Sequence, residues 1–149
     1  MNTPRKIFVD ADAFVALARE DDTNHKQAVS SLQHLIKQSV VFTTSNYVFA
    51  ESVTVISMRM GHAAAVRFIE AMQSDESNYL LQRTTDVIDE AAIRIFKEQT
   101  SKNTSFVDCT NMAFLKQFHM DAIFSFDGVY KKNGFVLVED FLSTHRQAA

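Results

Sequence analysis

Four acidic residues occupy positions that suggest chemistry rather than ordinary surface charge. Asp10 and Asp127 each follow a short apolar run typical of a buried strand, and Glu51 and Asp108 fall within apolar helical patterns. A buried carboxylate is costly unless a cation or hydrogen bonds compensate it, and carboxylates brought together repel one another. A hard divalent cation with oxygen ligands, Mg²⁺ or Mn²⁺, would offset both the cost of burial and the repulsion between the carboxylates. The acids therefore predict metal-assisted chemistry.

Each acid also has a purely structural interpretation. Asp108 stands three residues after Ser105, the spacing of a capping box that closes a helix end. Asp127 precedes a glycine and suits a turn, and Asp10 can cap the helix that follows it. Glu51 lies in the middle of a predicted helix, where neither a cap nor a turn explains it. Taken together, two acids at strand ends and two in apolar helical context favour a functional site.

The elements that would position these acids alternate along the chain. This alternation predicts a mostly parallel central sheet covered on both faces, which is a three-layer α/β/α fold. In such sheets ligands bind beyond the carboxyl ends of the strands, where Asp10 is expected. With 3 Gly and 1 Pro, no linker divides the chain, so residues 1–149 are expected to form a single domain. The expected strands are Ile7–Val9, Val40–Thr43, Tyr79–Leu81, Ala122–Phe126 and Phe135–Val138, and the expected helices cover about 13–18, 28–36, 47–60, 65–72, 87–96 and 103–119.

Composition and charge narrow the class of protein. The net charge is −3, so any site for a polyanion must be local. The single cysteine excludes an internal disulfide and fits a reducing compartment. The N-terminal residues lack the apolar core of a signal peptide, and no apolar run has the length needed to cross a bilayer. A cytoplasmic α/β protein without a membrane segment is therefore expected.

Four motifs in order resemble those of the PIN domain, a family of metal-dependent nucleases that includes VapC-type toxins. The family pattern is a strand ending in aspartate, a glutamate on an apolar helix, a Ser-Phe-x-Asp helix start, and a fourth acid after a later strand. The resemblance covers about the whole sequence, because both the order and the chain length agree. The matching segments are Phe8-Val9-Asp10, Val48-Phe49-Ala50-Glu51, Ser105-Phe106-Val107-Asp108 and Ser125-Phe126-Asp127.

This resemblance implies an endoribonuclease that hydrolyses RNA phosphodiester bonds, leaving 5′-phosphate and 3′-hydroxyl ends. One or two Mg²⁺ or Mn²⁺ ions would activate a water for in-line attack. Ser105 would support the metal site. The chain departs from the family pattern at Asp12, which stands where a small polar residue is common and could be an extra supporting ligand. It also departs at Gly128, where a basic residue often follows the fourth acid. The implied catalytic and metal-holding residues are Asp10, Glu51, Asp108 and Asp127.

Substrate and protein partners are also implied. Lys102, Lys131 and Lys132 are expected near the active edge, where they could hold backbone phosphates or simply be solvated. As a VapC-like protein, the chain would be the toxin of a toxin–antitoxin pair, with a cognate antitoxin and a homodimer as partners. The apolar helical segments 28–36 and 45–72 could supply contact surfaces, although a buried core explains the same pattern.

Two other functions compete with the nuclease hypothesis. Asp10 and Asp12 resemble the DxD nucleophile motif of haloacid-dehalogenase-like phosphatases, with Thr43-Thr44-Ser45 as a phosphate-binding hydroxyl. Against this, Phe14 replaces the usual Thr or Val, and Glu51 is left without a role. A catalytically inactive PIN fold used only for binding is the third hypothesis. Metal binding by the acidic cluster would distinguish it from the nuclease.

Overall fold

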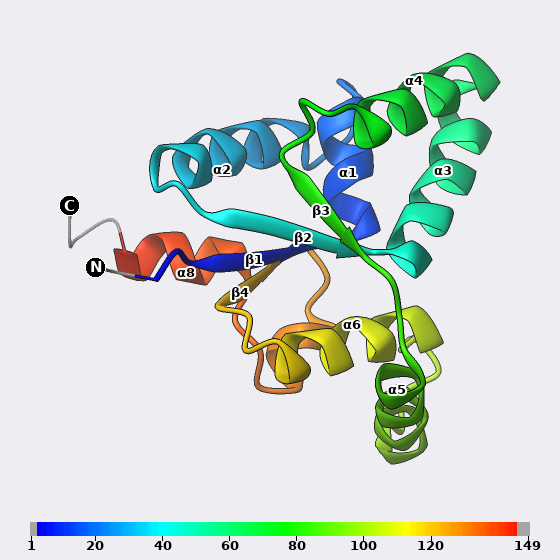
Figure 1. Cartoon of the computed structure of the whole chain (residues 1–149), viewed down its shortest axis with the longest axis vertical. Coiled ribbons are helices and arrows are strands. Elements are labelled where there is room, and N and C mark those ends of the chain that lie inside the picture. Colours follow the sequence, from blue (N-terminus) through cyan, green and yellow to red (C-terminus); the bar gives the residue numbers. More distant parts are fainter. Residues whose placement is uncertain (1–2, 146–149) are drawn as a thin grey trace.

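A parallel sheet forms the centre of the computed structural model, which describes residues 3–145 (Figure 1). Its strand order is β3-β2-β1-β4, and every pairing is parallel, so the carboxyl ends of all strands meet at one edge. The inner strand β1 is the predicted apolar run, and its Ile7, Phe8 and Val9 are fully buried. The strands are β1 (Lys6–Val9), β2 (Val41–Ser45), β3 (Tyr79–Gln82) and β4 (Ala122–Phe124).

Helices cover both faces of this sheet, as the predicted three-layer α/β/α arrangement requires. Helices α1 to α4 lie on one side and α5 and α6 on the other (Figure 1), while α8 packs against α2 and β4. Within the described residues, no helix combines the length and apolar character needed to cross a membrane. The helices are α1 (Ala11–Ala18), α2 (His25–Lys37), α3 (Asn46–Met60), α4 (His62–Gln73), α5 (Asp86–Glu98), α6 (Phe106–Gln117), α7 (Val129–Lys132) and α8 (Val138–His145).

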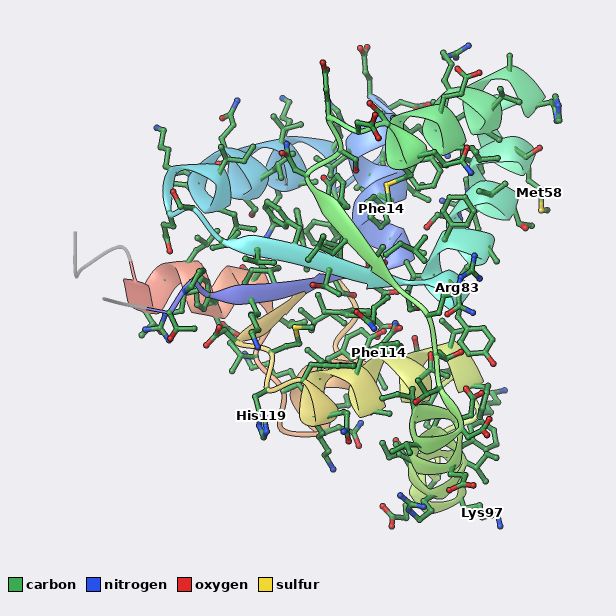
Figure 2. All side chains as sticks on the ribbon, in the orientation of Figure 1. Phe14, Met58, Arg83, Lys97, Phe114 and His119 are labelled. Carbon is green, nitrogen blue, oxygen red and sulfur yellow. The ribbon has the colours of Figure 1, made fainter. Side chains whose placement is uncertain are left out.

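Aromatic side chains fill the two layers between sheet and helices. On the α6 side, Phe114 stacks on Phe8 with ring centroids 5.4 Å apart. On the opposite side, Phe14 of α1 meets Phe68 and Tyr79 edge-on, at 5.4 and 5.1 Å. Figure 2 shows Phe14 and Phe114 on opposite sides of the sheet. These contacts hold α1 and α6 against the sheet. The residues that cap the two helices, Asp10 and Ser105, are candidate site residues.

The predicted last strand, Phe135–Val138, is wrong. Only Leu137 pairs with the sheet there, through an isolated parallel bridge to Ile123, and Val138 already begins α8. The reason is the spacing of apolar residues beyond the predicted strand. Val138, Phe141 and Leu142 are buried at helical spacing. This segment therefore packs against β4 as a helix and does not add a fifth strand to the sheet.

We expect truncation of the α6 core to be costly. Phe114 is completely buried, so Phe114→Ala should lower the free energy of unfolding by about 3–5 kcal/mol. Met58 is 81% exposed and points outward from α3 in Figure 2, so Met58→Ala should change that free energy by less than about 0.5 kcal/mol. Urea denaturation followed by circular dichroism measures both values. Equal losses in the two variants would contradict this description of the core.

Candidate functional site

Asp10 lies at the carboxyl end of β1 and caps the N-terminus of α1. Its backbone N–H donates to the Phe124 carbonyl (3.0 Å), which extends the pairing of β1 with β4 by one residue. Its side-chain Oδ1 accepts from the Ala11 N–H at 2.8 Å, and the residue is 6% exposed. The positive end of the helix dipole favours a carboxylate at this position. The predicted capping role is therefore confirmed, and it leaves Oδ2 for other partners.

Asp108 combines a structural role with a place in the site. Ser105 Oγ accepts from the Asp108 N–H at 3.0 Å, and Asp108 Oδ2 accepts from the Ser105 N–H at 2.9 Å. This is the predicted capping box, and it starts α6 at Phe106. It occupies only one carboxylate oxygen. The other, Oδ1, lies 3.2 Å from the hydroxyl of Tyr130.

Tyr130 and Asn111 link the two acids, and the sequence analysis missed both. The Tyr130 hydroxyl donates to Asp10 Oδ2 at 2.6 Å, and Asn111 Nδ2 donates to Asp10 Oδ1 at 3.1 Å. Asn111 follows Asp108 by three residues, so helical spacing alone could have placed it on the same face. Tyr130 reaches the site from α7 through tertiary packing, which no local pattern indicates.

Glu51 and Asp12 flank this pair on the side of α1 and α3. They share the lining of a cavity of about 350 Å³ with Asp22 and Arg59, among others. Asp12 Oδ2 accepts from Ser125 Oγ at 3.0 Å and from the Phe126 N–H at 2.7 Å. Within the described chain, Asp12 Oδ1 is buried and has no hydrogen-bond partner. A residue that lines this cavity thus has one buried carboxylate oxygen without a hydrogen-bond partner among the described residues.

The electrostatics of the site show that its acids influence one another. Burial, partly offset by hydrogen bonds, raises the pKa of Asp10 to about 6, and the Asp108 charge adds to the rise. Burial and then the Asp10 charge raise the pKa of Asp12 to about 7. Glu51 is exposed on α3, but partial burial of its carboxyl group raises its pKa, and the charges of Asp10 and Asp108 add to the rise. A nearby cation would favour the ionised form of all these carboxyl groups.

The fourth predicted acid, Asp127, faces a different cavity. Its Oδ1 accepts from the Val129 N–H at 2.9 Å, and no hydrogen bond in the described residues joins it to Asp10 or Asp108. It is exposed and lines a polar cavity of about 370 Å³ between the loop after α5 and helix α7. The structure therefore brings Asp10, Asp108 and Glu51 within mutual electrostatic reach and leaves Asp127 at their edge.

The three predicted substrate lysines have different surroundings. Lys132 lines the same cavity as Asp127. Lys131 forms an exposed ion pair with Asp140 of α8, with Nζ and Oδ2 3.4 Å apart. Lys102 is exposed in the loop before α6 and is not part of the cavity lining. Lys132 is thus the strongest candidate for a substrate contact.

The donor set fits a hard divalent cation that keeps part of its water shell. Among residues 3–145, no three acidic, histidine or cysteine side chains form a complete metal-binding group by themselves. Mg²⁺ seldom needs one, because it is commonly held by one or two carboxylates together with waters and substrate phosphates. Asp10 and Asp108 offer such a pair, with Glu51 and the unpaired Asp12 Oδ1 nearby.

Two of the three hydroxyl groups on which the phosphatase hypothesis depends, those of Thr44 and Ser45, have structural partners. Thr44 Oγ1 donates to the Val9 carbonyl at 2.8 Å, and Ser45 Oγ accepts from the Val48 N–H at 3.1 Å as the cap of α3. Both residues are completely buried. The end of β2 therefore holds neighbouring elements together, and neither of these hydroxyl groups is free for a phosphate.

The acidic residues gather at the carboxyl edge of a parallel sheet and follow one another along the chain in the order of the four motifs. The resemblance to the PIN domain implies this arrangement. The family model of the PIN domain matches residues 7–136. The chain belongs to the PIN domain family.

Among individual relatives, the chain is similar to VapC20 of Mycobacterium tuberculosis, described as a 23S rRNA-specific endonuclease. The two are 30% identical over 132 residues, which cover 89% of this chain and 97% of VapC20 from strain CDC 1551 / Oshkosh, and the figures for strain H37Rv are the same. A crystal structure of M. tuberculosis VapC20, described as a sarcin-ricin loop cleaving toxin, superposes with a TM-score of 0.77 and 29% identity. That match covers 87% of this chain and 96% of the VapC20 chain.

The capping box should contribute measurably to stability. Ser105→Ala removes the acceptor of the Asp108 N–H and should lower the free energy of unfolding by about 1 kcal/mol, whereas Ser105→Thr keeps a hydroxyl and should cost less. Urea denaturation compares the two variants. Equal losses would show that the hydroxyl bond contributes nothing to the start of α6.

Proposed function

We propose that this chain, acting as a single domain over residues 1–149, is a metal-dependent endoribonuclease. The observation that carries the proposal is the pair of carboxylates, Asp10 and Asp108, joined through one hydroxyl at the carboxyl edge of the sheet. The charges of both carboxylates act on Glu51. This geometry occurs in a PIN-domain chain whose relative VapC20 is named as an rRNA endonuclease.

Each acidic residue has a distinct part in the proposed reaction. Asp10 and Asp108 would hold a Mg²⁺ or Mn²⁺ ion, and Glu51 would complete the negative surroundings that attract it. When bound, such a cation lowers the pKa of a water and neutralises charge on the phosphate. Asp127 would act from the substrate side, because it opens onto the neighbouring polar cavity. Asp12 would add to the negative surroundings, because the charge of Asp10 acts on its carboxyl group.

The substrate we propose is a structured RNA, with 23S rRNA as the first candidate because VapC20 acts on it. The phosphate backbone would pass over the cavity that Lys132 and Asp127 line. Amide and hydroxyl side chains around this cavity can bond to ribose and base edges of an unpaired nucleotide. These side chains belong to Gln99, Thr100, Ser101, Asn103, Thr104 and Asn133.

We also propose that the chain is a toxin, kept inactive in the cytoplasm by a cognate antitoxin, and that it forms a homodimer. The support for protein partners is the likeness to VapC20, which is named a toxin. Several large apolar side chains are exposed on the described surface and available for such contacts. They include Met58 on α3, Leu80 on the edge strand β3 and Val87 on α5, which are 81%, 60% and 57% exposed.

RNA cleavage by the purified protein is the direct test of nuclease activity. We expect cleavage of ribosomal RNA with Mg²⁺ or Mn²⁺ and none with EDTA. Asp108→Asn should lower the rate by at least about a hundredfold, because the amide can still accept at the capping box but no longer carries charge. Glu70→Gln, an exposed change on α4, is the matched control and should retain activity.

Two results would overturn the nuclease proposal. Cleavage that survives both EDTA and Asp108→Asn would point to a contaminating nuclease. Failure of the wild-type protein to cut any of a broad set of structured RNAs, together with no Mn²⁺ binding by calorimetry, would identify an inactive PIN fold used for binding.

The neighbouring lysines allow a paired test of substrate binding. Lys132→Ala should weaken RNA binding and reduce the slope of log affinity against log salt concentration by about one, as expected for one lost phosphate contact. Lys131→Ala should leave the slope unchanged, because its ammonium group is paired with Asp140. Both slopes are measured from the binding of fluorescent RNA. Each lysine variant also carries Asp108→Asn, so that the RNA is not cleaved during the measurement. A reduced slope in Lys131→Ala with an unchanged slope in Lys132→Ala would instead place the RNA over α8.

A further inference from the structure

The Tyr130 hydroxyl occupies the space between the two carboxylates of the candidate site. The residue is 0% exposed, and its hydroxyl oxygen lies 2.6 Å from Asp10 Oδ2 and 3.2 Å from Asp108 Oδ1. A phenol has one hydrogen to donate, and the shorter contact identifies Asp10 as the acceptor. Burial and the two carboxylate charges raise the pKa of Tyr130, so the hydroxyl remains a neutral donor.

Asn111 determines which group donates and which accepts in each hydrogen bond of this network. Its Nδ2 donates to the Tyr130 hydroxyl oxygen at 2.9 Å and to Asp10 Oδ1 at 3.1 Å, which uses both amide hydrogens. Because the phenol oxygen accepts from Asn111, its own hydrogen must point toward the carboxylates. Turning the amide over would set its oxygen against the Asp10 carboxylate, so the surroundings fix its orientation.

The network leaves Asp10 with little freedom. Asp10 Oδ1 accepts from the Ala11 N–H and from Asn111, and Oδ2 accepts from Tyr130. A carboxylate has about four lone-pair directions, so three are used and one on Oδ2 remains. The hydroxyl of Tyr130 thereby determines which lone pair of Oδ2 stays free for another partner.

We propose that Tyr130, oriented by Asn111, is a positioning residue that prepares Asp10 and Asp108 to bind the divalent cation. This inference rests on the proposed function. A buried tyrosine whose hydroxyl merely finds partners would affect folding stability alone. A positioning residue also sets metal affinity, because outer partners of metal-binding groups fix their orientation, and their loss commonly weakens metal binding tenfold or more.

The test is Tyr130→Phe, which removes one oxygen atom and keeps the buried ring. Calorimetric titration with Mn²⁺ in the absence of RNA should show binding about tenfold weaker than in the wild type. Tyr79→Phe is the matched control, because Tyr79 lies at the opposite end of the sheet, at the start of β3, against Phe14 and Phe42. Its Mn²⁺ affinity should equal that of the wild type.

Cleavage assays provide a second readout. In Tyr130→Phe the Mn²⁺ concentration for half-maximal cleavage should rise about tenfold, and saturating Mn²⁺ should largely restore the rate. Melting temperatures in EDTA report stability separately. If Tyr130→Phe fails to fold, Asn111→Leu carries the same expectation, because it removes the donor to both Tyr130 and Asp10.

The possible results separate this inference from the function on which it rests. Wild-type protein that binds Mn²⁺, with Tyr130→Phe binding equally well or more tightly, overturns the positioning role and leaves the nuclease proposal intact. Wild-type protein that binds no Mn²⁺ overturns the metal dependence and the positioning role together. A loss of affinity in both Tyr130→Phe and Tyr79→Phe would also reject a specific role for the Tyr130 hydroxyl.

Discussion

Burial of the Asp10 carboxylate is the constraint on which the rest of the site depends. An ionised carboxyl group at 6% exposure is tolerated only where several donors surround it. Here three separate elements each provide one: the start of α1 through the Ala11 N–H, α6 through Asn111, and α7 through Tyr130. The inner strand β1 brings the group to the point where these elements converge. Even with these donors, burial keeps the pKa of Asp10 raised to about 6.

Structural and catalytic interpretations of these acids prove to be complementary. Asp10 caps α1 with one oxygen and receives Tyr130 on the other, and Asp108 closes its capping box with Oδ2 while Oδ1 faces the same hydroxyl. A carboxylate has two oxygens, so the bond that orders the backbone also aims the remaining oxygen. A helix cap is therefore a suitable position for a metal-binding carboxylate, because the capping hydrogen bond holds the carboxylate in one orientation.

The parts of the fold and site that could be predicted are those with local signals. Strand β1 was recognisable from its apolar run and its terminal aspartate, and the start of α6 from the spacing of Ser105 and Asp108. The last strand failed as a prediction because the apolar residues after Leu137 continue at helical spacing, which a short window does not distinguish from a strand.

Residues placed by tertiary packing had no such signal. Tyr130 enters the site because α7 packs against α6, and nothing in its own neighbourhood indicates a partner 120 residues earlier. Likewise, Lys131 and Lys132 are adjacent and alike in type, but the path of α8 pairs the first with Asp140 and leaves the second at the cavity. The local sequence therefore does not indicate which of the two lysines reaches the cavity.

The two cavities beside the acidic pair differ in a way that bears on how a polyanion could approach. One is lined by Asp12, Asp22 and Glu51 with Arg59 as its cation, so its acids outnumber its base. The other is lined by amides and hydroxyls, with Asp127 balanced by Lys132. A phosphate chain meets less repulsion over the second cavity, while the first favours cations. In a chain of net charge −3, this asymmetry would favour the approach of RNA over the second cavity and of a cation over the first.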